Sequence, residues 1–177
     1  FHPTHISYIY NRYKRAGDTT MDESFFPILW REDGYRSLWL DDYLRGKAAA
    51  LCIAHSVLFL GYVTDGTLAA LRERVAVFAI PSRGEGFGLV YLEAMRTSLA
   101  CVGGSGDAAV DVIVPGESGE LVDPANIAGV AETIVRLLRS PDLRSRYGAA
   151  GRRRFETHFT FDRYCERLAP ILKAAFA

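Results

Sequence analysis

The sequence predicts an α/β fold in which a Rossmann-like parallel sheet is covered by helices on both faces. Two observations carry this prediction. Short, wholly apolar runs recur along the chain and end at glycine or proline, as strands buried on both faces of a parallel sheet do. Segments with helical spacing of apolar residues lie between these runs, and this alternation is typical of parallel sheets.

The N-terminal fifty residues (1–50) are rich in aromatic side chains and irregular, and we interpret them as the remnant of the first βα units. Residues 6–10 and 26–30 are candidate strands, and Pro27 makes the second one irregular. Residues 38–54 have the apolar stripe of a helix. The chain starts at Phe1 rather than at Met, so we expect it to be part of a longer protein.

From residue 57 onwards, strands and helices alternate regularly. We expect a strand buried on both faces at 57–60, a second buried strand at 75–80, and further strands at 99–102 and 119–122. Helices are expected between them at 65–74, 89–97 and 107–114. Three further helices are expected to open at Asp123-Pro124, Ser140-Pro141 and Thr160, because Asp, Ser and Thr cap helices and Pro suits the first turn.

Charge and cysteine content exclude several classes of function. Lys plus Arg and Asp plus Glu both total 21, so no whole-surface attraction to nucleic acid is expected. Cys52, Cys101 and Cys165 form no C-x-x-C pair, which argues against a metal or thioredoxin-like site and favours three reduced, buried thiols. No apolar stretch reaches the length of a spanning helix. We expect a cytoplasmic protein, and peripheral attachment at the inner face of the membrane stays compatible with the sequence.

A glycine-rich loop joins the expected strand 75–80 to the expected helix 89–97. Ligands of open α/β sheets bind at such carboxyl ends of strands. Gly84, Gly86 and Gly88 would let backbone N–H groups approach a ligand closely. The helix that begins near Gly88 would direct its positive end at the same place. The sequence therefore predicts a phosphate site that needs no net positive charge.

Two glutamates accompany this loop. Glu85 lies within it, and Glu93 lies one turn into the helix, where side chains tilt back towards the N-terminus. Carboxylates are good acceptors for vicinal hydroxyls, so the combination suits a nucleotide sugar. On residue type and spacing alone, two solvated glutamates are an equally good interpretation, because a lone glycine loop is a weak signal.

Several motifs in order resolve this choice. They are V-L-F-L-G-Y-V at 57–63, V-F-A-I-P-S at 77–82, E-G-F-G-L with E-A-M at 85–95, and G-E-S-G-E-L-V-D-P at 116–124. Through them, residues 57 to about 165 resemble the C-terminal, donor-binding half of family 4 glycosyltransferases with the GT-B fold, whose E-x7-E motif matches 85–93. The resemblance implies that 51–177 form a nucleotide-sugar-binding, Rossmann-like domain with C-terminal helices.

The resemblance also implies a reaction, in which a sugar passes from a nucleotide diphosphate sugar to an acceptor with retention, without a cofactor and usually without a metal. Glu85 would contact the sugar hydroxyls at the catalytic centre, as a positioning group rather than an acid or base, and Glu93 would accept from the ribose. The rest of the donor site would be Gly86, Phe87, Gly88 and Leu89. The acceptor would be a glycan, a lipid or a small molecule, bound by an N-terminal domain or a partner subunit.

The chain departs from the family at two places. The Arg and Lys that neutralise the diphosphate have no match, since the nearest segment, N-R-Y-K-R-A-G at 11–17, has a different spacing. Where the family often has Gly-Gly-x-Pro-Glu, residues 103–111 place Asp111 near the glutamate position.

Other interpretations stay open. G-S-G-D-A-A at 104–109 imitates a dinucleotide-binding fingerprint, although its helix would end after about two turns. A binding module that holds a nucleotide sugar without transferring it is the alternative function. The run Arg152-Arg153-Arg154 favours a solvated helix face over a nucleic-acid patch.

Overall fold

The computed structural model describes residues 7–9, 26–30, 37–60, 63–83, 87–106 and 108–175. Its strands are β1 (Ser7–Ile9), β2 (Phe26–Trp30), β3 (Val57–Phe59), β4 (Val77–Ile80), β5 (Ala100–Gly104) and β6 (Gly119–Val122). Its helices are α1 (Ser37–Ala50), α2 (Asp65–Arg72), α3 (Leu89–Arg96), α4 (Ala109–Val112), α5 (Ile127–Arg139), α6 (Pro141–His158) and α7 (Phe161–Ala175), with a short 3-10 turn η1 (Ala54–Ser56) before β3.

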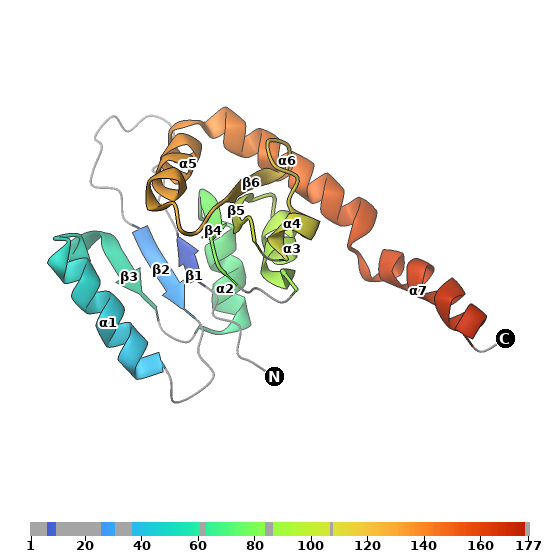
Figure 1. Cartoon of the computed structure of the whole chain (residues 1–177), viewed down its shortest axis with the longest axis horizontal. Coiled ribbons are helices and arrows are strands. Elements are labelled where there is room, and N and C mark those ends of the chain that lie inside the picture. Colours follow the sequence, from blue (N-terminus) through green and yellow to red (C-terminus); the bar gives the residue numbers. More distant parts are fainter. Residues whose placement is uncertain are drawn as a thin grey trace.

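The strands pair in two groups, β1-β2-β3 and β4-β5-β6, and β1 lies beside β4 (Figure 1). The pairs β2–β3, β4–β5 and β5–β6 are parallel, which confirms the predicted fold class. The exception is β1, which runs antiparallel to β2. A parallel pair needs a crossover connection that usually holds a helix. Among the described residues no helix lies between β1 and β2, which agrees with the antiparallel pairing of these two strands.

Helices cover both faces of the sheet, and the alternation of side chains along β4 shows how. Phe78 and Ile80 pack with residues of α2, α3 and α4 on one face. Val77 and Ala79 pack with residues of α5 and α6 on the other. Because successive strand residues point to opposite faces, a run that is buried on both faces must be apolar throughout. This is why the sequence shows β4 as an unbroken apolar run.

The expectation that 57–60 is buried on both faces is wrong. Val57 and Phe59 are half-buried, and Leu58 is 40% exposed. The reason is position in the sheet, since β3 is the outer strand of its group and has a strand partner on one side only. An apolar run predicts that a segment forms a strand, but it does not predict whether that strand lies at the edge of the sheet.

Two of the three cysteines are exposed, which corrects the expectation of three buried thiols. Cys52 follows the end of α1 with a φ of 58°, and Cys165 lies on the outer surface of α7. Cys101, the second residue of β5, is fully buried, and burial raises the pKa of its thiol to about 12. Apolar neighbours in the sequence therefore predicted burial correctly for Cys101 in its strand, and wrongly for the two other cysteines.

Two of the three expected helix starts are confirmed. The Ser140 hydroxyl accepts from the Leu143 amide at the start of α6, and the Thr160 hydroxyl accepts from the Arg163 amide at the start of α7, both at 3.4 Å. Asp123 does not start a helix. Its carboxylate accepts from the amide of Ala125 at 2.9 Å and closes a turn, and α5 begins later, capped by Asn126.

Helix α7 extends away from the body of the molecule (Figure 1). The residues expected on its apolar face are exposed or half-buried: Phe161, Tyr164, Leu168, Ile171 and Leu172. Within the described part of the chain, no helix is long and apolar enough to cross a membrane.

The arginine run on α6 is more than a solvated face. Arg152 donates to the carbonyl oxygen of Arg96 at the end of α3, at 2.8 Å. Arg154 donates to the carbonyl oxygens of Val112 at 2.8 Å and Asp111 at 3.0 Å. Only the exposed Arg153 fits the interpretation as a solvated face. The run therefore ties α6 to α3 and α4.

Candidate donor site at the start of α3

The candidate site begins where β4 ends and α3 starts. Gly88 is the N-cap of α3, and its φ of +67° lies in the left-handed region that favours glycine. Because Gly88 has no side chain, it leaves the first amides of α3 without a side-chain cap. The uncapped first turn and the helix dipole make this end a suitable place for an anion. The predicted start of the helix is confirmed.

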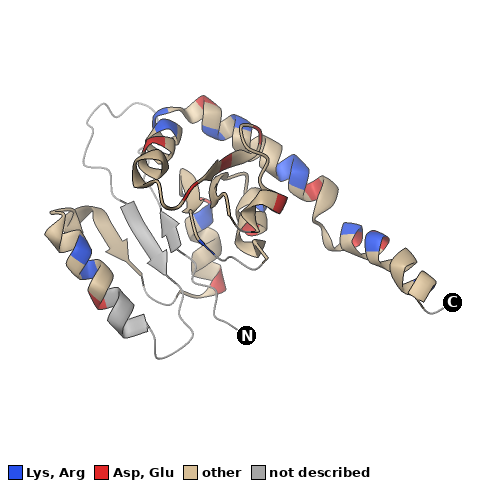
Figure 2. Cartoon of the chain, viewed as in Figure 1, with Lys and Arg blue, Asp and Glu red and all other residues tan. Residues whose placement is uncertain are grey.

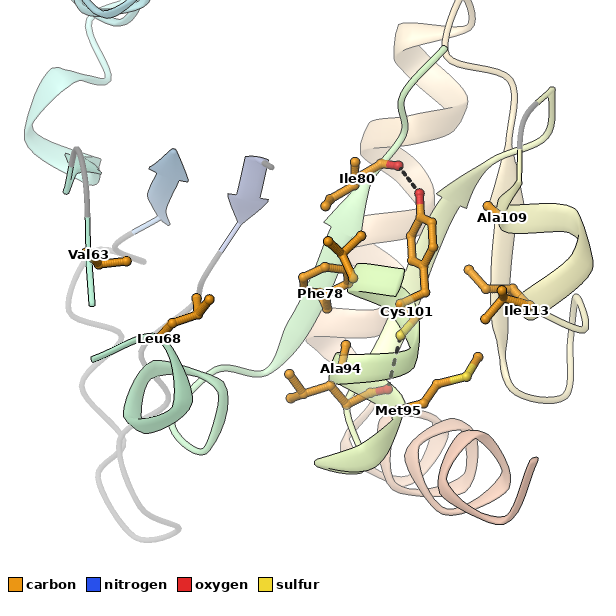
Figure 3. Packing of buried hydrophobic residues seen from close by; sticks show 13 residues of the cluster. Val63, Leu68, Phe78, Ile80, Ala94, Met95, Cys101, Ala109 and Ile113 are labelled. Atoms are coloured by element: carbon orange, nitrogen blue, oxygen red, sulfur yellow. Dashed lines mark hydrogen bonds between the residues drawn. The ribbon is translucent and has the colours of Figure 1, made fainter. Parts of the chain in front are cut away.

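Tyr91 fixes this helix start to the strand. Its hydroxyl donates to the carbonyl oxygen of Ile80, the last residue of β4, at 2.6 Å (Figure 3). Its ring meets that of Phe78 edge to face, with centroids 5.9 Å apart. The tyrosine is fully buried, so the hydroxyl needs this partner. Both ends of the glycine loop are thereby tied together. No sequence pattern had singled out Tyr91.

The neighbouring strand end is shaped by close packing. Gly103 was expected to end its strand, but β5 continues through Gly104. A Cβ at Gly103 would lie 2.6 Å from the Cβ of Ala109 and 3.3 Å from the ring of Tyr91. The glycine is required because α4 lies directly against the strand. Helix α4 is also shorter than predicted, with four residues, which is too short for the helix of a dinucleotide fingerprint.

The predicted site residues are found in different surroundings. Glu85 and Gly86 lie outside the described residues, as do Gly84 and Asp107. Phe87 is 78% exposed and Leu89 is 56% exposed, so two large apolar side chains face solvent on either side of Gly88. Gly88 itself is buried. This exposed apolar pair lies beside the uncapped start of α3, where it could contact a ligand.

Glu93 has a partner that the sequence did not reveal. Its Oε2 atom accepts from Nη2 of Arg72, the last residue of α2. Glu93 is the fifth residue of α3, about 6 Å along the axis from Leu89. Its side chain is 44% exposed. One signal could have found Arg72: it follows the buried Leu68 by four residues, so it lies on the buried stripe of its helix.

The electrostatics of the molecule match a local anion site. Figure 2 shows Lys and Arg intermixed with Asp and Glu along the described elements, on α6 and α7 in particular. Arg83 is an exposed cation three residues after the end of β4, on the carboxyl side of that strand. The basic segment 11–17 lies outside the described residues. In the same described part, no group of three or more His, Cys, Asp and Glu is placed to hold a metal ion.

Together these residues could hold a molecule that carries both phosphate and hydroxyl groups. The amides at the start of α3 suit phosphate oxygens. The half-exposed Glu93 carboxylate suits hydroxyl donors, because an ionised carboxylate only accepts hydrogen bonds.

Comparison with known proteins places the chain in a family. The family description "Glycosyl transferases group 1" matches residues 40–154. The phosphatidyl-myo-inositol mannosyltransferase of Mycobacterium leprae is 39% identical over 112 residues, which are 63% of this chain and 29% of that protein. A GDP-mannose-dependent alpha-(1-6)-phosphatidylinositol monomannoside mannosyltransferase of Mycobacterium tuberculosis is 30% identical over 90% of this chain and 44% of its own length.

A solved structure supports the fold. Anabaena HepE in complex with UDP-glucose superimposes with a TM-score of 0.75 and 19% identity, over 84% of this chain and 40% of that one. The chain thus spans less than half the length of each of these proteins.

Proposed function

The chain belongs to the group 1 glycosyl transferases, and on this premise we propose that it is the donor-binding half of a retaining glycosyltransferase of family 4. The reaction would transfer a sugar from a nucleoside diphosphate sugar to an acceptor. The observation that carries the proposal is the start of α3, which combines uncapped amides with a half-exposed Glu93 on the same helix. The family match, over residues 40–154, includes the whole of α3 and the loop before it.

Each predicted residue has a role in the proposal. Amides around Gly88 and Leu89 would bind the diphosphate, together with Phe87 and Gly86, and Glu93 would accept hydrogen bonds from the ribose. Glu85 would position the sugar through its hydroxyls. Catalysis would depend on orientation and on stabilising the charge of the leaving diphosphate, both of which act through fixed dipoles.

The names of the relatives narrow the donors to test. One relative is described as GDP-mannose-dependent, and one structural neighbour is a complex with UDP-glucose. We propose a nucleoside diphosphate hexose as donor and rank GDP-mannose first, because the curated relatives described above are mannosyltransferases. The names of those two relatives also contain phosphatidylinositol-based acceptors, which supports an acceptor presented at a membrane surface and a peripheral attachment of this chain.

A thermal shift assay tests donor binding. GDP-mannose, UDP-glucose and UDP-N-acetylglucosamine are titrated against the chain, and a bound donor raises the melting temperature in proportion to the logarithm of its concentration. Glu93→Ala should reduce the response to the binding donor. Glu132→Ala, which removes an exposed glutamate of α5, is the matched control and should respond like wild type. A full response from Glu93→Ala would contradict the ribose contact. No shift with any donor would contradict the proposed function.

A second candidate is a module that binds a nucleotide sugar without transferring it alone. It would use the same start of α3 and the same Glu93 carboxylate, without the transfer step. Release of nucleoside diphosphate from the bound donor separates the two functions. Turnover by the chain supports the transferase, and saturable binding without turnover supports the module.

A further inference from the structure

The ion pair between Arg72 and Glu93 joins two helices of the candidate site. Arg72 ends α2, and Glu93 lies in the middle of α3. Arg72 is one of two polar residues among the described ones that are buried, and an arginine this deeply buried is normally paired. Its position four residues after the buried Leu68 directs its side chain towards the core that α2 shares with α3.

The pair is asymmetric in exposure. The Arg72 side chain is 7% exposed, whereas that of Glu93 is 44% exposed. The cation is therefore held inside the protein, and the carboxylate extends from it towards solvent. Oε2 of Glu93 accepts from Arg72. A carboxylate has about four lone-pair sites, so the outer part of the group can accept further hydrogen bonds from a ligand.

We infer that Arg72 is a positioning residue, which holds the Glu93 carboxylate in the orientation that accepts the ribose hydroxyls. The inference rests on the proposed function. A long glutamate side chain loses rotamer freedom when it binds, and that cost weakens binding. A buried guanidinium restricts the glutamate before the ligand arrives. Arginine suits this task better than lysine, because its planar fork fixes the direction of the bond.

The inference is tested by comparing ribonucleotides with their 2′-deoxy forms. Dissociation constants of GDP, 2′-deoxy-GDP, UDP and 2′-deoxy-UDP are measured by calorimetry, and the ratio of deoxy to ribo constants reports the ribose contact. Hydrogen bonds to a charged group predict a wild-type ratio of roughly ten or more for the nucleotide that binds. Glu93→Gln should bring this ratio close to one.

Arg72→Met should lower the ratio to about three or less, because the carboxylate remains but loses its fixed orientation. Arg72→Lys should give a ratio between those of Arg72→Met and wild type, because the charge is kept and the fork is lost. Arg136→Met is the control. It removes the Arg136–Glu120 pair, on the helix that covers the opposite face of the sheet, and should leave the ratio unchanged.

Each outcome has one meaning. An unchanged ratio in Arg72→Met, with only a lower melting temperature, would make Arg72 merely structural and overturn the inference. If Arg72→Met fails to fold by circular dichroism, the ratio of Arg72→Lys decides, and a wild-type ratio there overturns the inference. A wild-type ratio in Glu93→Gln would refute the ribose contact while nucleotide binding stands. Absence of binding to both wild-type ribonucleotides would refute the proposed function and the inference with it.

Discussion

Replacing Gly103 with alanine tests whether the close packing of α4 against β5 is as tight as the structure shows. The new Cβ would lie 2.6 Å from the Cβ of Ala109, 2.9 Å from Cδ1 of Ile113 and 3.3 Å from Cζ of Tyr91. Carbon atoms in contact prefer about 3.5 Å or more. Ile113 can rotate its terminal methyl group away, but the Cβ of Ala109 moves only with its backbone.

The substitution therefore requires α4 to move by about 1 Å, since 2.6 Å must grow to about 3.5 Å. Ala109 and Ile113 are almost fully buried, so the shift disturbs a packed interior. Overpacking of this kind costs about 1–3 kcal/mol, and we expect about 2 kcal/mol for Gly103→Ala. With a urea dependence of about 2 kcal/mol per molar, the unfolding midpoint should fall by about 1 M.

Urea unfolding followed by far-UV circular dichroism measures this change. Gly106→Ala is the matched control, because a Cβ there meets nothing within 4 Å and its φ is not positive. The control should stay within about 0.5 kcal/mol of wild type. Equal midpoints for the two variants would refute the packing argument. A changed urea dependence would indicate an altered native or denatured state instead.

Three further predictions concern residues around the site. Tyr91→Phe removes the buried hydrogen bond from the Tyr91 hydroxyl to the Ile80 carbonyl, which keeps its bond from the Ser82 amide, and should cost about 1 kcal/mol in the same assay; an unchanged midpoint would contradict this. Cys101, with its pKa raised to about 12, should resist a thiol reagent at pH 8 while the two exposed cysteines react. Above about pH 9 the unfolded thiol loses its proton and the folded one does not, so the free energy of unfolding should fall as pH rises, and Cys101→Ala should remove that part of the slope. Arg154→Met should cost about 1 kcal/mol by freeing the end of α4, whereas Arg153→Met should be neutral, and equal effects would refute the assigned contacts.

The sequence predicted the elements well because local pattern dictates them. The apolar run of β4, the helix start near Gly88 and the caps of α6 and α7 all depend on residues near in the chain. The donor site at the start of α3 stays a prediction, made from glycines and glutamates that all lie within 84–93.

Features that depend on distant residues were missed or misjudged. The sequence placed Asp123 as a helix cap, but the chain turns there before α5 starts. It treated Gly103 as the end of a strand, although the strand continues and the glycine makes room for α4. It predicted that 57–60 is buried on both faces. This was wrong because apolar character does not indicate which strand lies at the edge of a sheet.

By itself, then, the sequence determined the class of fold, the helix start at Gly88 and the place of Glu93 one turn into that helix. Only the tertiary structure decided that β1 pairs antiparallel to β2, that Tyr91 closes the loop onto β4 and that Arg72 meets Glu93. The reason is sequence separation. Backbone conformation and helix caps are fixed by neighbours within about four residues, whereas the partner of a buried guanidinium 21 residues away is chosen by how two helices pack.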